Sequence, residues 1–265
     1  MMTKIDSASE YVALGSSYAA GPGLKPRADG SPRPAGRSAA NYAHLFAQRR
    51  SLRLVDMTYS GAVSADLLSA GKRGPAQLDA VTTKTRLVTI TAGGNDIGYL
   101  PTLTLSSLPA RLGHLPRLAR RIRTAMDPSV MEKRLADLES QLGEVASTIR
   151  GRSPHAEIVF VDYLTILPLE GEPAHPLNEE VIVWGRAAAR KLGETYAAVA
   201  AREDCRFLSV GARSAKHHAW SKDPWTRRFH LSLSGGAPYH PNAEGMERVA
   251  GMLDDILEGD SRARR

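Results

Sequence analysis

The chain has 265 residues, of which 42% are hydrophobic and 24% charged, an ordinary balance for a globular protein with a sizeable core. This length favours a single domain over residues 1–265. No apolar run approaches the roughly 20 residues that span a bilayer, and the single cysteine, Cys205, excludes an intramolecular disulfide. The first residues lack the apolar stretch of a secretory signal. We therefore expect a cytoplasmic location.

The formal net charge of +7 makes nucleic acid and anionic membrane surfaces partners to consider. Residues 111–123 contain five arginines and no acidic residue, and residues 261–265 contain three more arginines. No zinc-finger, aromatic RNA-binding or basic-zipper pattern accompanies them, so we expect no nucleic-acid partner. We expect residues 259–265 to form a flexible, solvated tail.

The first half of the chain alternates between patterns typical of strands and of helices. In chain order, the residues predict a strand at 11–15, a loop at 21–38, a helix at 41–50 and strands at 52–56 and 87–91. Each strand is a short apolar run, and the loop is rich in glycine and proline. Such short runs suit strands that are buried on both faces.

The second half opens with an insertion at about 98–128, where prolines interrupt a leucine-rich and arginine-rich stretch. We interpret it as broken helices that lie outside the core. In chain order there follow an amphipathic helix at 130–149, a strand at 157–162, a long helix at 178–202, a strand at 206–210, a loop at 211–239 and a closing helix at 242–257.

Strands that alternate with helices predict an α/β fold, a three-layer α/β/α sandwich with a five-stranded parallel sheet. In such folds, ligands bind beyond the carboxyl ends of the strands. Polar segments lie at these ends: Ser17 follows the first strand, Gly61 the second and Asn95 the third, while His240 precedes the closing helix.

These four residues have the chemistry that ester cleavage by serine requires. Ser17 supplies a hydroxyl at a strand-to-helix turn, and His240 supplies a base, because imidazole titrates near neutrality. The backbone N–H groups of Ser17 and Gly61 and the side-chain amide of Asn95 supply oxyanion donors. Loss of one such donor typically lowers the rate about a hundredfold or more.

The same residues resemble the signature of the SGNH (GDSL-type) hydrolase superfamily. Residues 15–18 (GSSY) resemble its GDSL block, residues 94–96 (GND) its third block and residues 240–241 its last block, with Gly61 in the second. The sequence of residues 13–21 is similar to the corresponding segment of actinobacterial esterases and lipases. The resemblance implies a flavodoxin-like fold and acyl-ester hydrolysis with no metal or organic cofactor. Some such relatives are secreted, which the N-terminal pattern here does not favour.

Two positions depart from the family pattern. Ser16 replaces the aspartate of the GDSL block, and Ala237 replaces the aspartate that usually lies three residues before the histidine. We therefore hypothesise a dyad of Ser17 and His240, with a backbone carbonyl from residues 236–238 orienting the imidazole. Asp223 is the alternative candidate for the missing acid.

Structural interpretations stand beside the functional ones. Ser17 and Gly61 also suit turns, and Asn95 suits a loop. Asp96 is interpreted as a structural residue that binds loop amides. The adjacent pair His217 and His218 suits a loop better than a metal site, because neighbouring residues rarely chelate one ion together. Cys205 is interpreted as a structural cysteine.

Two interpretations of the 100–122 stretch stay open. In the first, its leucines form a lid or a wall for an acyl chain and its arginines make weak contact with an anionic membrane surface. In the second, it packs on the sheet edge with solvated arginines. Retention on liposomes only when they contain anionic lipid would distinguish membrane contact.

The leading function is a carboxylesterase or lipase that acts on a small-molecule or lipid ester. The alternative is a catalytically idle binding protein with the same fold, supported only by the missing acid at Ala237. Nucleic-acid binding rests on charge alone, and a salt-dependent gel shift would detect it. The sequence indicates neither the natural acyl donor nor an oligomeric state.

Overall fold

A computed structural model describes the chain except for residues 1–4, 6–7, 110–114, 232–235 and 263–265, and except for the side chains from residue 259 onward. Five strands form one sheet in the order β2-β1-β3-β4-β5, and every neighbouring pair is parallel. The strands are β1 (Glu10–Gly15), β2 (Arg53–Asp56), β3 (Thr85–Thr91), β4 (Glu157–Val161) and β5 (Arg206–Leu208). The predicted five-stranded parallel sheet is confirmed.

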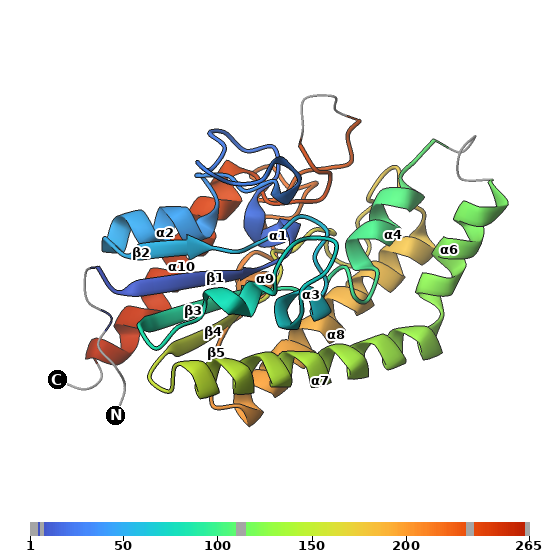
Figure 1. Cartoon of the computed structure of the whole chain (residues 1–265). Helices are drawn as coiled ribbons and strands as arrows, with labels where there is room; N and C mark the ends of the chain where they lie inside the picture. Colours follow the sequence, from blue (N-terminus) through green and yellow to red (C-terminus); the bar gives the residue numbers. More distant parts are fainter. Residues whose placement is uncertain (1–4, 6–7, 110–114, 232–235, 263–265) are drawn as a thin grey trace.

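Helices cover both faces of this sheet, as Figure 1 shows. They are α1 (Ser17–Ala20), α2 (Tyr42–Arg50), α3 (Ala65–Leu68), α4 (Tyr99–Ser106), α6 (Pro116–Met126), α7 (Pro128–Arg152), α8 (Glu179–Arg202), α9 (Val210–Arg213) and α10 (Ala243–Arg262), with 3-10 turns at Arg33–Ala35 and Gln77–Ala80. Helix α10 packs on α2 on one face, and α7 packs on α8 on the other. The predicted three-layer sandwich is confirmed.

The core lies on both sides of the central strands. All six residues of β1 are buried, and buried side chains from β1 through α10 form one hydrophobic cluster. Tyr11 of β1 and Phe46 of α2 meet edge to face, with ring centroids 5.8 Å apart. Within the described residues, no helix has both the length and the hydropathy of a membrane span.

The first part of the insertion belongs to the core, contrary to the prediction that this stretch lies outside it. Tyr99, Leu100 and Leu103 of α4 are buried because α4 packs against α8. Helix α6 is continuous over Pro116–Met126 and largely exposed, with only Ala125 buried. The prolines therefore separate the helices without excluding the first of them from the core.

The closing helix is longer than predicted. Helix α10 continues to Arg262, whereas the sequence pattern predicts its end at residue 257. Residues 263–265 and the side chains from 259 onward lie outside the described part, so the flexible tail predicted for 259–265 stays a prediction.

The sheet order places a crevice between the carboxyl ends of β1 and β3. From β1 the chain passes to β2 on one side and then to β3 on the other, so the connections leave in opposite directions. Ligand sites of open parallel sheets form at such a switch point. Helix α1 begins here, and its first residue is Ser17.

The carboxyl end of β1 is held by an unusually close backbone approach. Gly15 has a φ of 148°, and a Cβ at this position would lie 2.3 Å from the carbonyl oxygen of Thr91 in β3. The Gly15 N–H donates to Oε1 of Gln77 at 2.7 Å, and Nε2 of Gln77 donates back to the Gly15 carbonyl at 3.0 Å. Only glycine fits this junction, which fixes where Ser17 begins its helix.

We predict that Gly15→Ala destabilises the fold by about 3 kcal/mol or more, because it adds both a backbone strain and a steric clash. Gly151→Ala is the matched control: a Cβ there meets nothing within 4 Å, and alanine favours the α7 helix. Urea unfolding followed by circular dichroism measures both. Equal stability of the Gly15→Ala and wild-type proteins would contradict the clash.

Candidate active site

Ser17 and His240 meet at the carboxyl edge of the sheet although 223 positions separate them in the chain. The Ser17 hydroxyl oxygen lies 2.7 Å from Nε2 of His240. Ser17 is 9% exposed and His240 8% exposed, so the pair is shielded from bulk water. A hydroxyl in hydrogen-bond contact with an imidazole is the arrangement that activates a serine nucleophile.

The second imidazole nitrogen is bound by the backbone. Nδ1 of His240 lies 2.8 Å from the carbonyl oxygen of Pro238. A carbonyl only accepts hydrogen bonds, which assigns the proton to Nδ1 and leaves Nε2 free to accept from the Ser17 hydroxyl. The acceptor lies within the 236–238 segment that the sequence suggests, and Ala237 offers no carboxylate.

Burial lowers the pKa of His240 to about 4, from an ordinary value of 6.5. Removal from water disfavours the charged imidazolium, and the nearby Arg227 lowers the pKa further, while the Pro238 carbonyl raises it. His240 is therefore neutral at pH 7. The sequence alone suggests a titration near neutrality, and burial accounts for the difference.

A neighbouring segment fixes the backbone around His240. Arg227 donates its N–H to the His240 carbonyl at 2.9 Å, and the Tyr239 N–H donates to the Arg227 carbonyl at 3.1 Å. Tyr239 is buried with a φ of 63°, and its hydroxyl is hydrogen-bonded to Ser107 at the end of α4. The insertion thus contacts Tyr239, the residue immediately before His240.

Aromatic residues position Ser17 from the opposite side. The ring of Tyr18 packs on that of Tyr163 with centroids 4.4 Å apart, and the Tyr18 hydroxyl donates to the Leu164 carbonyl at 2.9 Å. The Tyr163 hydroxyl accepts from the Gly94 N–H at 2.9 Å and lies 3.4 Å from the Ser16 hydroxyl. Ser16 thus contacts a tyrosine where the family pattern has an aspartate.

Gly61 and Asn95 follow β2 and β3. Gly61 has a φ of 78°, a conformation that glycine adopts readily. Nδ2 of Asn95 donates to the Ala62 carbonyl at 2.8 Å, which orients the amide and occupies one of its two hydrogens. The structure therefore links the Asn95 side chain directly to the Gly61 loop.

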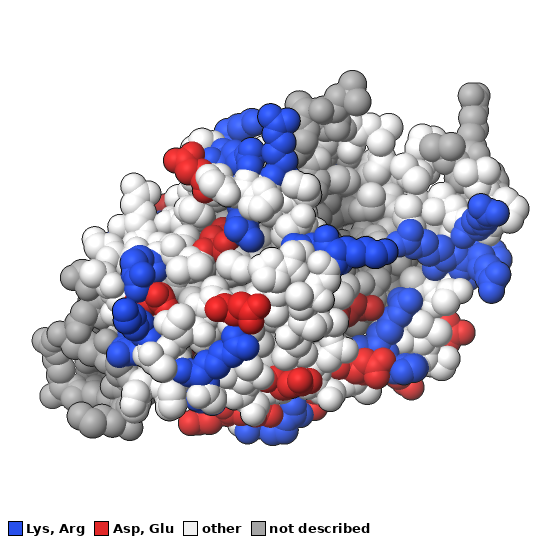
Figure 2. All heavy atoms as spheres, viewed as in Figure 1, with Lys and Arg blue, Asp and Glu red and all other residues white. Residues whose placement is uncertain are grey.

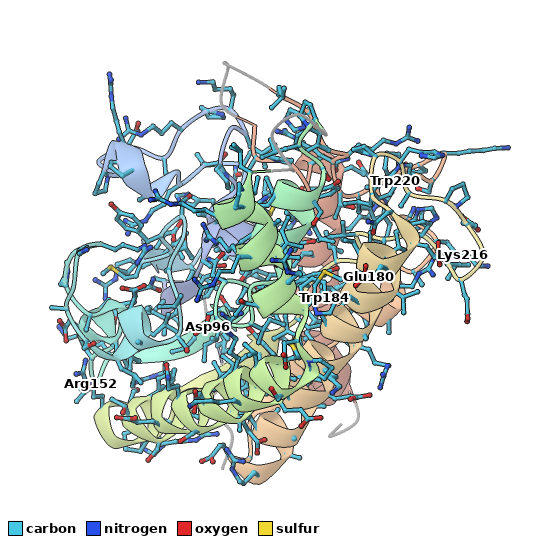
Figure 3. The ribbon with its side chains drawn as sticks, turned by 90° about the vertical axis from the view of Figure 1, so that its right-hand side faces the viewer. Asp96, Arg152, Glu180, Trp184, Lys216 and Trp220 are labelled. Carbon is cyan, nitrogen blue, oxygen red and sulfur yellow. The ribbon has the colours of Figure 1, made fainter. Side chains whose placement is uncertain are left out.

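Asp96 strengthens the same link. Its Oδ1 accepts from the Ser64 N–H at 2.8 Å and from the Ser64 hydroxyl. Figure 3 labels Asp96 at this edge of the sheet. Burial raises the pKa of Asp96 despite these hydrogen bonds. Its partners are loop groups, which agrees with the structural interpretation from the sequence.

Asp56 is a supporting residue that the sequence analysis does not identify. It ends β2 and accepts from Nδ2 of Asn41 and from the Thr58 N–H, each at 2.9 Å. Hydrogen bonds from His44, Thr58 and Asn41 lower its pKa and outweigh the opposing effect of burial, which is the largest single contribution. Asn41 also donates to the Ala20 carbonyl at 3.3 Å, which ties Asp56 to the end of α1. An aspartate at a strand end two residues before a threonine is the signal that could have indicated it.

Two other candidate groups from the sequence lie elsewhere. Asp223 pairs with His217, whose Nδ1 is 3.2 Å from the carboxylate, and His217 stacks on Trp225. It does not orient His240, whose Nδ1 is bound to Pro238. Among the residues that the structure describes, no three His, Cys, Asp or Glu side chains gather as metal ligands.

Cys205 has the properties of a structural thiol. It is half-buried, and its Sγ lies 3.3 Å from the Glu203 carbonyl. Burial raises the pKa of the Cys205 thiol to about 11, so the nucleophilic thiolate is scarce at pH 7.

Comparison with known proteins identifies the family. The model of the GDSL-like Lipase/Acylhydrolase family matches residues 13–248. Lipase 2 of Streptomyces coelicolor is 33% identical over 258 residues, covering 94% of this chain and 85% of the relative. A lipase of Streptomyces rimosus is 32% identical over 242 residues, covering 91% and 84%.

Solved structures agree with these relatives. The extracellular lipase of S. rimosus has a TM-score of 0.76 and 30% identity, covering 94% of this chain and 99% of that one. Phospholipase A1 of Streptomyces albidoflavus NA297 has a TM-score of 0.77 and 27% identity with the same coverage. Their fold is the parallel α/β sandwich described above.

The prediction of a cytoplasmic location is wrong by the same comparison, because the similar S. rimosus lipase is extracellular. The prediction relied on the lack of an apolar stretch in the first residues and on the single cysteine. One cysteine excludes an internal disulfide but not an oxidising compartment, since a domain with a large hydrophobic core is stable without disulfides.

The family match, the relatives and the fold all lead to one assignment. The matched region contains each of the residues that the sequence analysis singles out as candidates for catalysis and oxyanion binding. The chain belongs to the GDSL-like lipase/acylhydrolase family and is a carboxylic ester hydrolase.

Proposed function

We propose that the chain hydrolyses acyl esters through an acyl-enzyme on Ser17, with His240 as general base. The observation that carries this proposal is the 2.7 Å contact between the Ser17 hydroxyl and Nε2 of His240. The assignment of the proton to Nδ1 gives Nε2 the free electron pair that a base needs. The names of the relatives, lipase and phospholipase A1, support a small-molecule or lipid ester as substrate.

The proposed reaction has two steps. In the first, Nε2 of His240 accepts the Ser17 proton while the hydroxyl oxygen bonds to the ester carbonyl carbon. The imidazolium then returns the proton to the departing alkoxide, which leaves an acylated Ser17. In the second step, His240 deprotonates a water molecule that attacks the acyl carbon, and the proton returns to Ser17 as the acid departs.

The developing oxyanion is proposed to bind three donors. The Ser17 N–H lies in the first turn of α1, where helical backbone donors lack a partner within the helix. The Gly61 N–H follows β2, and Asn95 retains one amide hydrogen beyond its bond to Ala62. Preorganised donors of this kind stabilise the transition state more than the ground state.

A dyad replaces the usual triad in this proposal. The Pro238 carbonyl holds the His240 tautomer but carries no full charge, so it stabilises the imidazolium less than a carboxylate would. This is consistent with the low pKa of His240. The rival hypothesis of an idle binding protein has only Ala237 in its support.

The insertion is proposed to form part of the acyl-binding wall. A cavity of about 870 Å³ lies between α4, α6 and the start of α8, and Leu105, Leu108, Ile122, Met126 and Phe229 contribute its apolar lining. The Phe229 ring lies 6.4 Å from that of Tyr239, next to His240. This favours the wall over an insertion that only covers the sheet edge.

We predict that a fluorophosphonate probe labels Ser17 in the wild-type protein and that His240→Ala loses the label, because the serine then lacks its base. Mass spectrometry of the digested protein locates the adduct. His217→Ala is the matched control: it removes another loop histidine, which stacks on Trp225, and should keep the label. A folded wild-type protein without an adduct would instead favour the idle binder.

We predict that kcat/KM stays level from neutral pH down to about 5 and is half-maximal at about pH 4, since only neutral His240 acts as a base. The unfolded chain takes up this proton at a higher pH than the folded protein, so the His240 contribution to stability falls as pH drops below about 6.5. Circular dichroism must therefore show a folded protein at each pH. A fall of kcat/KM to half its maximum near pH 6.5 would contradict the proposal that burial lowers the pKa of His240.

We predict that Ala237→Gly retains most of the activity, within about threefold, because the Pro238 carbonyl and not a side chain at 237 orients His240. The measurement is kcat/KM for a nitrophenyl ester, beside a thermal melt that monitors the loop. If a variant with the wild-type melting temperature is inactive, the backbone role of this segment is refuted.

A further inference from the structure

A basic cavity adjoins Asn95 on the side of the insertion. It has a volume of about 430 Å³ and lies between α4, α6 and α7. Asn95 lines it together with Arg117, Arg120 and Arg121 of α6 and Arg134 of α7. The cavity thus gathers four arginines and a proposed oxyanion donor around one space.

No negative charge balances these arginines within the described part of the chain. No carboxylate lines the cavity, and the structure gives Arg117, Arg120 and Arg121 no ion pair. Arginines elsewhere on the surface do pair, for example Arg202 with Glu139 at 2.5 Å and Arg248 with Glu244 at 2.6 Å. What distinguishes this place in the fold is that several unpaired arginines line one cavity.

The helix geometry concentrates the charge. Arg120 and Arg121 lie three and four positions after Arg117, so both are neighbours of Arg117 on the surface of α6, where like charges repel. Figure 2 shows basic side chains gathered over α6 at the right of the molecule. Arg134 is half-buried, and its Nη1 donates to the Ile97 carbonyl at 3.4 Å. An anion in the cavity would offset this repulsion.

A further arginine lies at Gly61, another of the three proposed donors. A Cβ built on Gly61 would lie 3.5 Å from the Arg73 guanidinium. Arg73 is held at 3.1 Å from Asp66, so its charge is largely balanced. The surplus positive charge is therefore on the Asn95 side, where the cavity lies.

We propose that this cavity is a subsite for a phosphate group carried by the ester substrate. The inference rests on the proposed function and extends it to a substrate class, acyl esters that bear a phosphate. Guanidinium groups bind phosphate oxygens with paired hydrogen bonds, and several together recognise the full charge of the group. The apolar residues Pro101 and Leu105 of the same cavity contact the carbon atoms beside it.

Binding to a protein that cannot turn over tests the subsite. Calorimetry with Ser17→Ala compares dibutyrylglycerol 3-phosphate with uncharged dibutyrylglycerol, which presents the same esters. We expect the phosphorylated compound to bind at least about tenfold tighter, and we expect the added substitutions Arg117→Gln, Arg120→Gln and Arg121→Gln to remove that advantage. Added salt should weaken the binding of the phosphorylated compound and leave the binding of the uncharged compound unchanged.

A matched control removes the same charge elsewhere. Arg213→Gln, Lys216→Gln and Lys222→Gln lie outside this cavity and should change the affinity by less than about twofold. Figure 3 labels Lys216 well apart from Asp96. Equal affinity for the two compounds, or equal losses in the two triple variants, would overturn the subsite.

Further measurements identify the kind of molecule that carries the phosphate, and they distinguish failure of the subsite from failure of the proposed catalytic mechanism. Tighter binding of the soluble phosphorylated compound supports the subsite and indicates a soluble phosphate ester. If α6-dependent flotation with phosphatidic acid vesicles accompanies it, the subsite also takes a lipid headgroup. Hydrolysis of both compounds by the wild type at equal rates, without tighter phosphate binding, refutes the subsite and leaves the ester hydrolase. Phosphate-dependent binding without any hydrolysis or Ser17 adduct supports the subsite and refutes the proposed mechanism.

Discussion

The close approach of β1 and β3 at Gly15 is the constraint on which the site depends. With no Cβ, Gly15 brings the two backbones together, and Gln77 binds both its N–H and its carbonyl. Ser16 then donates its N–H to the Thr91 carbonyl at 2.9 Å, so α1 begins at a fixed point. The Ser17 hydroxyl therefore reaches Nε2 of His240 through rigid backbone geometry and not through a flexible side chain.

Burial decides how the dyad would work. A carboxylate partner would raise the pKa of His240 strongly, whereas burial here outweighs the smaller rise from the Pro238 carbonyl and leaves the imidazole neutral over a wide pH range. A base of low pKa is a weak proton acceptor, so the proposed mechanism relies more heavily on oxyanion stabilisation. The hydrogen bonds among Asn95, Ala62, Asp96 and Ser64 supply the rigidity that such stabilisation requires.

The insertion joins the apolar and the charged features of the proposed substrate site. Helix α4 buries Leu100 and Leu103 in the core, which anchors the insertion beside the sheet. Leu105 of the same helix lines both the large apolar cavity and the basic cavity. An ester with an acyl chain on one side and a phosphate on the other would therefore span α4, with its carbonyl near Asn95.

The sequence by itself determined the five strands, their parallel alternation with helices and the positions of Ser17, Gly61, Asn95 and His240 at strand and helix ends, because these features follow from local apolar periodicity and motif order. It suggested a carbonyl from residues 236–238 near His240 but not its pKa. Tertiary structure alone decided three features: the hydrogen bonds of Gln77 to the Gly15 backbone, the link from Asp56 through Asn41 to the end of α1, and the position of α4 in the core. Each depends on segments far apart in the chain. It also decided that the α6 arginines and Asn95 line one cavity, because a count of charges does not show which part of the fold a helix packs against.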